Sequence, residues 1–351
     1  MELTKQDTQM AKGIAVLGMV MLHLFCRLGE LPYVPLLWCG DTPLIYYLGL
    51  FGDLCVPVFC FCSGYAHYLM ASSQGKQYPK RLPGKALRFL CNYWIVVLLF
   101  SLLGLIFDKS GQIPGSLSRF LGNMAVVGMC YNGAWWFVVT YLILLVLSPI
   151  LAAITRHVNG IVLLTVSCGF YFVFYMLRFN YPIHFDNPVP NWIWQQLVLL
   201  GTSQFGYLLG MVVRRYELVR KLRDFLTTRQ VLRRMLVLAF PLAAFIGHCL
   251  IQSLFVAPFT AAAVLISLFL AKLPGWARTI FLMLGKHSTN IWLVHMFFYL
   301  QLFTGFAFWG RYPVFILALM LCACFLSSLV IDSIYRPVLS WLDRRQQKAE
   351  V

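Results

Sequence analysis

About ten apolar runs, each close to the length of a membrane-spanning helix, limit the fold of this sequence more than any other feature. A helix needs about 20 mainly apolar residues to cross the hydrocarbon core of a bilayer. Lipid offers no hydrogen bonds to an open backbone, so such runs predict helices. The sequence therefore predicts an all-α integral membrane protein with about ten transmembrane helices and a single domain over residues 1–351. The spans are expected at about residues 12–30, 43–70, 87–107, 133–154, 160–178, 193–213, 235–252, 254–271, 279–303 and 313–335.

Composition and charge agree with a membrane protein and exclude a nucleic-acid-binding one. Apolar residues make up 60% of the chain and charged residues only 11%, whereas soluble domains carry roughly 25% charged residues. A formal net charge of +16 would suggest a nucleic-acid partner in a soluble protein. Here the basic residues lie mainly in short connections between apolar runs, as in a multi-pass membrane protein.

The distribution of lysine and arginine predicts the orientation. With the N-terminus inside, 23 of the 28 basic residues fall in inner segments. The outer exceptions are Arg27, Lys109, Arg119, Arg178 and Arg311. Because cytoplasmic loops carry an excess of Lys and Arg, both termini are expected in the cytoplasm.

The 11 cysteines lie mostly inside the apolar runs, where they are expected as small apolar fillers. No pair of Cys-x-x-Cys motifs and no cysteine–histidine spacing typical of zinc occurs, so no metal is expected. Cys39 is expected in an outer loop, where it could form a disulfide with Cys26 or Cys130.

A lysine and a histidine share one face of the first apolar run, in the stretch KGIAVLGMVMLH. Lys12 and His23 are separated by about three helical turns, or ~16 Å along the axis. An ionisable group in hydrocarbon costs at least ~2.5–3.5 kcal/mol and needs a reason. His23 could bridge two helices as a neutral imidazole. Because Lys12 and His23 share a face, we favour a functional role for His23, with Lys12 at the inner edge of the membrane and His23 deeper.

The second run contains an aspartate close to a predicted break. Pro57 removes the helical hydrogen bond to the Asp53 carbonyl, and a break in lipid is tolerated only beside protein or a wet cavity. Asp53 is expected at a depth comparable to that of His23. A carboxylate there could fix the tautomer of the imidazole and raise its basicity. Alternatively, Asp53 caps the break or binds a neighbouring serine.

Five further positions allow a structural or a functional interpretation. Lys85 and Arg88 lie three residues apart on one helix face, where they could bind an anionic ligand or only anionic lipid headgroups. Trp135 and Trp136 open the fourth run, where they could line a cavity or belong to an aromatic belt. His295, in the ninth run, could line the same cavity or be a packed polar residue.

Several of these stretches resemble motifs of the acyltransferase family 3 membrane proteins. That family carries an arginine, ten residues and a histidine in its first span, and Lys12 and His23 have this spacing with lysine replacing arginine. Its second span usually has a phenylalanine-rich run that ends in Ser-Gly-aromatic. The stretch VFCFCSGY is similar to it, with Ser63, Gly64 and Tyr65.

Three later stretches extend the resemblance. The family often has Arg-x-x-Arg at the inner start of the third span, and KALR resembles it with Lys85 and Arg88. Lysine is a point charge and cannot form the two parallel hydrogen bonds by which arginine binds a phosphate, so any phosphate contact here would be less directional. The stretch AWWFVVTYLILLVLSPIL resembles the family's Leu-Trp-Tyr/Phe-Leu segment. LGKHSTNIWLVH resembles its Gly-x-x-Ser-x-x-Ile-Tyr-Leu-x-His segment, with Gly285, Ser288 and His295.

The resemblance, from about residue 7 to 336, implies transfer of an acyl group, usually acetyl, from cytoplasmic acyl-CoA to a hydroxyl. Implied acceptors are sugars of surface glycans or lipid-linked glycans, and the implied location is the bacterial cytoplasmic membrane. A histidine is suited to act as the general base, because its unperturbed pKa is ~6.5. Direct transfer and an acyl-histidine intermediate both remain open. The expected roles are catalysis by His23 and Asp53, donor binding by Lys12, Lys85 and Arg88, and cavity lining by Ser63, Tyr65, Trp135, Trp136 and His295.

Two other functions fit parts of the sequence. A transporter or exporter could use Lys12, His23 and Asp53 as a proton or substrate relay. No inverted hydropathy repeat, common in transporters, is evident. A membrane scaffold without chemistry leaves the embedded ionisable residues unexplained. Turnover of labelled acetyl-CoA, as opposed to flux through liposomes, distinguishes the enzyme from the transporter.

Overall fold

The computed structural model describes residues 2–27, 29 and 31–349, with side chains described as far as residue 344. Within these residues the regular secondary structure is helical apart from two short antiparallel strands, β1 (Trp38–Cys39) and β2 (Thr42–Pro43). It forms two compact units. Unit 1 consists of Met1–Cys26, Tyr46–Lys80 and Thr140–Lys286, and unit 2 of Arg27–Ile45, Arg81–Val139 and His287–Val351. The expectation of a single domain stays a prediction.

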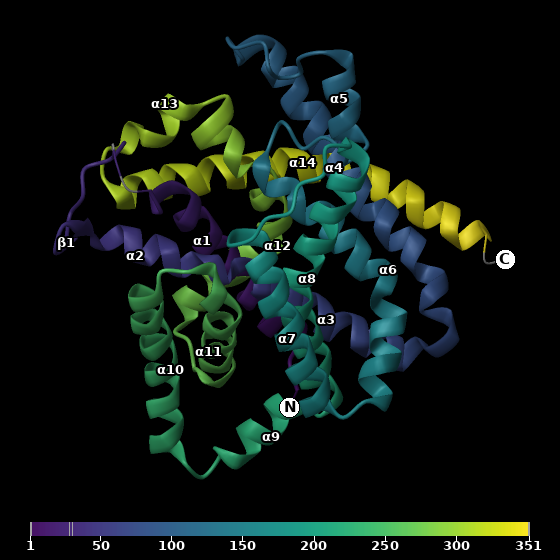
Figure 1. Cartoon of the computed structure of the whole chain (residues 1–351), viewed down its shortest axis with the longest axis vertical. Coiled ribbons are helices and arrows are strands. Elements are labelled where there is room, and N and C mark those ends of the chain that lie inside the picture. Colours follow the sequence, from purple (N-terminus) through teal and green to yellow (C-terminus); the bar gives the residue numbers. More distant parts are fainter. Residues whose placement is uncertain (1, 28, 30, 350–351) are drawn as a thin grey trace. The chain divides into compact units, whose positions relative to one another are not determined.

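Unit 1 is built around α3 and α8, which pack along each other (Figure 1). α7 lies along α8, α10 lies along α11, and α1 contacts both α3 and η1. Its elements are α1 (Lys5–Phe25), most of α2 (Leu44–Leu50), η1 (Phe51–Leu54), α3 (Cys55–Gln74), η2 (Gly75–Gln77), most of α6 (Trp136–His157), α7 (Gly160–Phe179), α8 (Pro188–Arg215), α9 (Leu218–Phe225), α10 (Gln230–Ile251), η5 (Leu254–Val256), α11 (Ala257–Leu270) and the first half of α12 (Gly275–Met296).

α1 begins earlier than the hydropathy predicts. Thr4 and Asp7 form a reciprocal cap, in which the Asp7 backbone N–H donates to Thr4 Oγ1 at 3.1 Å and the Thr4 N–H donates to Asp7 Oδ2 at 2.9 Å. Such a capping box fixes a helix start. Lys12 therefore lies two turns inside the helix, and His23 lies in its last turn. Their depths in the membrane, with Lys12 at the inner edge and His23 deeper, stay a prediction. The predicted end of this span near residue 30 falls partly on residues 28 and 30, which lie outside the described residues.

The predicted break before Pro57 is confirmed. The chain passes from α2 through the 3₁₀ turn η1 into α3, and Pro57 occupies the first turn of α3, where no backbone donor is needed. Two glycines hold the break against α1. A Cβ atom on Gly52 would lie 2.0 Å from the Gly18 carbonyl oxygen, and one on Gly18 would lie 3.1 Å from the Gly52 Cα. No larger residue fits at Gly52 without moving the backbone.

Unit 2 contains three long helical segments and several short ones. Its elements are β1, β2, α4 (Leu82–Phe107), α5 (Leu117–Met124), η4 (Gly133–Trp135), the second half of α12, the π-helix η6 (Phe297–Gln301), α13 (Thr304–Ala307), η7 (Phe308–Gly310) and α14 (Pro313–Ala349). The short 3₁₀ helix η3 (Pro79–Arg81) joins η2 to α4. The axis turns by 99° between Gly275–Gln301 and Thr304–Gly310. α4 and α14 pack together.

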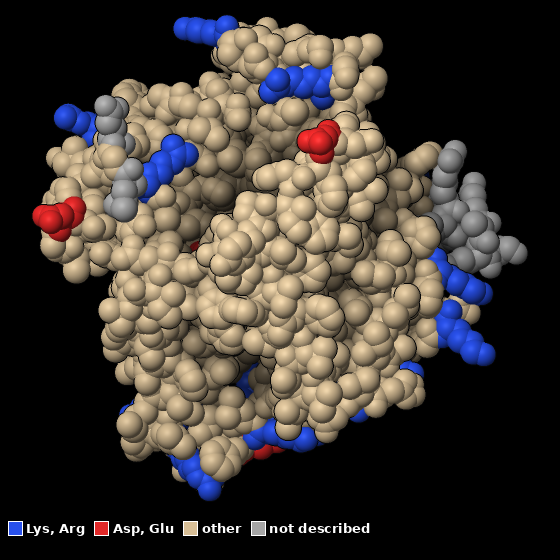
Figure 2. All heavy atoms as spheres, viewed as in Figure 1, with Lys and Arg blue, Asp and Glu red and all other residues tan. Residues whose placement is uncertain are grey.

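The apolar runs form helices, which supports a helical membrane protein. Among the described residues, eight helices are long and apolar enough to span a membrane, and the bent pair ending at Gly310 makes a ninth. The segment Leu254–Leu270 is apolar but shorter. Figure 2 shows a surface over α7, α8 and α10 that is almost free of charge, with Lys and Arg gathered near α9. These helices coincide with the ten expected segments, whereas the count of ten spans and the location of the termini stay predictions.

Candidate active site

α1 places Lys12 and His23 on one side of a continuous helix. Both side chains are half-buried. The uninterrupted helix Lys5–Phe25 fixes their separation at about 16 Å along the axis and about 20° around it. Gly18, which contacts η1, lies about 140° around the helix from His23. Lys12 and His23 therefore face a different side of α1 from the break that carries Asp53.

Asp53 lies against a histidine of α10. Its side chain is fully buried, and Oδ2 is 3.1 Å from Nε2 of His248, whose side chain is 1% exposed. The same Nε2–H donates to the Leu50 carbonyl oxygen at 3.0 Å. Because the neighbouring Gly52 contacts Gly18, Asp53 lies beside the second half of α1. The structure thus pairs Asp53 with His248, and its expected link to His23 stays a prediction.

The Ser-Gly-aromatic motif of α3 has a packing role in the structure. A Cβ atom on Gly64 would lie 1.9 Å from the Tyr207 carbonyl oxygen, so α3 and α8 are in backbone contact there. The buried Tyr65 donates its hydroxyl proton to Glu2 Oε2 at 2.8 Å and accepts from the Leu3 N–H at 3.2 Å. Ser63 is half-buried. Tyr65 therefore fastens the residues that precede α1.

The two expected donor-binding residues of unit 2 lie in the first two turns of α4. Lys85 is half-buried. Arg88 Nη2 lies 2.7 Å from Asp343 Oδ1 of α14, with side chains 40% and 54% exposed, and Tyr335 donates to the Arg88 carbonyl at 2.8 Å. These contacts fix the start of α4 against α14. Since Lys12 belongs to unit 1, the meeting of all three cations in one cavity stays a prediction.

Asn92, one turn after Arg88 on α4, belongs to a buried polar network. Asn92 Nδ2 donates to Asn290 Oδ1 at 2.7 Å. Asn290 Nδ2 donates to Ser328 Oγ and to Asp332 Oδ1, both at 3.0 Å. His287 Nδ1 lies 2.9 Å from Ser328 Oγ and 3.5 Å from Asp332 Oδ2. The network connects α4, α12 and α14.

No role was assigned to any residue of this network from the sequence. A usable signal was present. Asn92 follows Lys85 by seven residues, which places it two turns further along nearly the same face of α4. Two polar residues on one face of an apolar helix would have pointed to a polar partner.

The tryptophan pair and His295 are packed residues of unit 2. Trp135 is fully buried, its Nε1–H donates to the Leu293 carbonyl at 2.9 Å, and its ring meets Tyr93 edge-on at 4.9 Å. Trp136 is half-buried. His295 is also fully buried and donates Nδ1–H to the Trp292 carbonyl at 2.7 Å. Trp135 is thus an internal anchor of α12, and an aromatic belt does not describe it.

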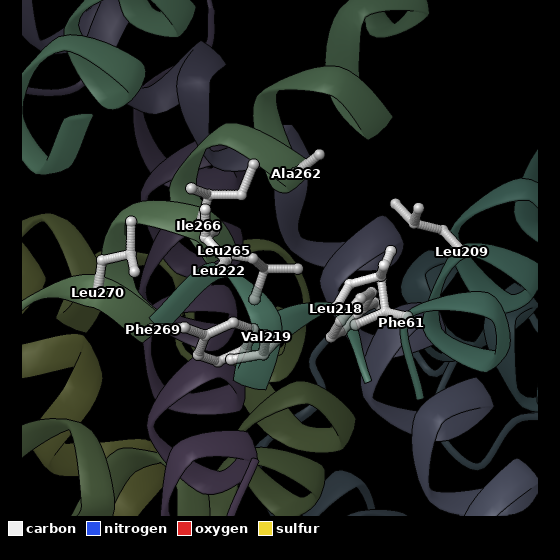
Figure 3. A pocket seen from close by; sticks show the side chains of 11 residues that line it. Phe61, Leu209, Leu218, Val219, Leu222, Ala262, Leu265, Ile266, Phe269 and Leu270 are labelled. Atoms are coloured by element: carbon white, nitrogen blue, oxygen red, sulfur yellow. The ribbon is translucent and has the colours of Figure 1, made fainter. Parts of the chain in front are cut away.

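Unit 1 contains an apolar groove (Figure 3). It has a volume of about 400 Å³ between α3, α8, α9 and α11. Its walls are formed by Phe61, Leu209, Val213, Leu218, Val219, Leu222, Ala262, Leu265, Ile266, Phe269 and Leu270. These apolar side chains offer no hydrogen-bonding or charged group to a phosphate or a sugar hydroxyl.

The family comparison decides the class of protein. The family model described as an acyltransferase domain matches residues 9–332, nearly the whole chain. The chain belongs to acyltransferase family 3. The match includes each stretch on which the resemblance was based. No curated protein and no solved structure shows a significant match to the chain.

Membership of acyltransferase family 3 makes the protein an acyltransferase, of a kind that is typically membrane-bound. The helices of the described chain agree with a multi-pass membrane protein. All 11 cysteines are free thiols in the structure, so it forms neither of the disulfides considered for Cys39. Within the described residues, no three His, Cys, Asp or Glu side chains lie together as metal ligands would.

Proposed function

We propose that the protein is a membrane-bound O-acyltransferase that moves an acetyl group from cytoplasmic acetyl-CoA to a hydroxyl of a surface glycan or lipid-linked sugar. Two things support the proposal: the family match over residues 9–332, and the common face of Lys12 and His23 on one unbroken helix. The second observation carries the mechanism. In this proposal ten spans cross the bacterial cytoplasmic membrane and both termini lie in the cytoplasm.

His23 acts as the general base of the reaction. The neutral imidazole takes the proton of the acceptor hydroxyl while the hydroxyl oxygen forms a bond to the thioester carbonyl carbon. The carbon–sulfur bond then breaks, and the CoA thiolate takes the proton back from the imidazolium. Atoms and charge balance without a further reactant. A positioned base typically contributes about 10²–10⁴-fold to the rate.

The donor is held at its phosphates by basic residues. Lys12, Lys85 and Arg88 lie in the inner halves of α1 and α4 in the proposed orientation. Cations at one end of a cavity raise the local concentration of an anionic ligand, and the effect falls with ionic strength. Lys12 and His23 are about 16 Å apart along one face. That separation suits a phosphate-bearing head below and an extended thioester arm above.

The proposal is tested with purified protein in liposomes and acetyl-CoA labelled in the acetyl group. We expect release of free CoA thiol together with transfer of label to an added membrane glycan fraction, identified by mass spectrometry. Flux of label across the liposome membrane without thioester cleavage would make the protein a transporter. Liposomes containing the His23→Ala variant serve as the control for uncatalysed thioester hydrolysis.

A further inference from the structure

One acceptor atom in the network of unit 2 is buried and unused. Asn92 is 6% exposed, and its Nδ2 is bound to Asn290. Its Oδ1 accepts no hydrogen bond from any residue that the structure describes. Leaving a buried acceptor unsatisfied costs about 1–3 kcal/mol. Such a group in a native protein calls for a ligand or another specific reason.

The rest of the network holds Asn92 in a fixed orientation. Both Asn290 amide hydrogens are used, one by Ser328 Oγ and one by Asp332 Oδ1. Asn290 Oδ1 must therefore face the amide nitrogen of Asn92, at 2.7 Å. Since that contact takes an Asn92 N–H, the Asn92 oxygen is left facing away from Asn290. The network thus presents a preoriented carbonyl acceptor.

One member of the same network is partly exposed. The Asp332 side chain is 23% exposed, whereas Ser328 is fully buried. Asp332 offers a carboxylate, which is an acceptor for N–H and O–H groups and repels phosphates. The acceptors of Asn92 and Asp332 therefore favour groups that carry N–H or O–H donors and disfavour phosphates.

The position along α4 identifies such a donor. Asn92 lies seven residues after Lys85, about 10 Å further along the axis and about 20° around it. Lys85 and Arg88 are the residues proposed to hold the phosphates of the donor. In acyl-CoA, an arm with two secondary amides and a hydroxyl connects the phosphates to the thioester. A ligand anchored by its phosphates at Lys85 and Arg88 would bring amide N–H groups to the level of Asn92.

We propose that Asn92, oriented by Asn290 and helped by Asp332, binds the amide-bearing pantetheine arm of the acyl donor. This inference rests on the proposed function and names a subsite of it. Asn92 Oδ1 accepts an amide N–H of the arm. Lys85 and Arg88, one to two turns earlier on α4, bind the phosphates. The amide contact and the phosphate contacts contribute separately to donor affinity.

The experiment compares three donors that lose these parts in turn: acetyl-CoA, S-acetylpantetheine without the nucleotide and phosphates, and S-ethyl thioacetate without the arm. Asn92→Leu should weaken the apparent affinity for the first two by about 5-fold, the value of one neutral hydrogen bond. It should leave S-ethyl thioacetate unaffected. Arg88→Gln should weaken acetyl-CoA alone. Ser101→Ala is the matched control, because Ser101 is another buried polar residue on the opposite face of α4.

The inference is overturned if Asn92→Leu changes the affinity for all three donors by the same factor, or if Ser101→Ala has the same effect. Asn92→Ala replaces the leucine variant if the latter does not fold. Absence of turnover in the wild-type protein would refute the proposed function. Equilibrium binding of labelled CoA and of pantetheine to the same variants then decides the inference separately.

Discussion

The contact between Gly18 and Gly52 predicts a graded response to single methyl groups. Gly52→Ala would place a Cβ atom 2.0 Å from the Gly18 carbonyl oxygen. Because this oxygen is a backbone atom, rotation of a side chain cannot relieve the clash. Gly18→Ala would place a Cβ atom 3.1 Å from the Gly52 Cα. Overpacking of this kind costs about 1–3 kcal/mol, and Gly52→Ala should lie at the upper end.

Two glycines of the same unit provide controls. At Gly169 of α7 and Gly247 of α10, an added Cβ atom would have no described neighbour within 4 Å. Alanine there should be neutral or stabilising, by up to about 1 kcal/mol, because glycine is a poor helix former. All four residues lie in helical segments of unit 1.

The assay is thermal unfolding of the purified variants in one detergent, followed by circular dichroism. The expected order of midpoints is Gly169→Ala and Gly247→Ala at or above wild type, then Gly18→Ala, then Gly52→Ala, with the last lower by several degrees. A Gly52→Ala midpoint equal to that of Gly247→Ala would refute the close approach of η1 and α1.

Two further substitutions test buried contacts by the same assay. His248→Leu leaves the Asp53 carboxylate buried without its partner and should destabilise the protein by about 3–5 kcal/mol. His248→Gln keeps an N–H donor and should lower the unfolding midpoint less. Equal midpoints for the two variants would contradict the pairing of His248 with Asp53. Trp135→Phe removes one hydrogen bond to the Leu293 carbonyl oxygen. Because Asn132 also donates to that oxygen at 2.9 Å, the variant should lose only about 1 kcal/mol of stability. Unfolding of the variant at ambient temperature would contradict this.

The helices could be predicted from sequence because lipid imposes length and apolarity on every span. The break before Pro57 was equally predictable, since proline has a local effect on the backbone. The start of α1 was missed because the Thr4–Asp7 cap lies in a polar stretch, which a hydropathy criterion excludes. As a result, Lys12 lies about two turns after the start of α1, whereas the hydropathy pattern places it at the start.

The partners of the embedded polar residues could not be predicted. Asp53 and His248 are 195 residues apart, and no local pattern relates them. Asn92 meets Asn290 from a helix 198 residues away. The sequence position of Trp135 suits a cavity wall or an aromatic belt, and its complete burial excludes the belt. Which face of a helix meets which neighbour depends on tertiary packing, and a single sequence does not contain that information.

The central claim is that His23 performs the chemistry while Lys12, three turns away on the same face, holds the donor. The most direct measurement is the acetyl-transfer rate of the His23→Ala and Lys12→Gln variants over a range of acetyl-CoA and salt concentrations. His23→Ala should lower kcat by about 10²–10⁴-fold with little change in acetyl-CoA binding. Lys12→Gln should weaken that binding, most strongly at low salt, and Lys12→Arg should be tolerated. Near-normal turnover by His23→Ala, or donor binding by Lys12→Gln that equals wild type at every salt concentration, would contradict the account.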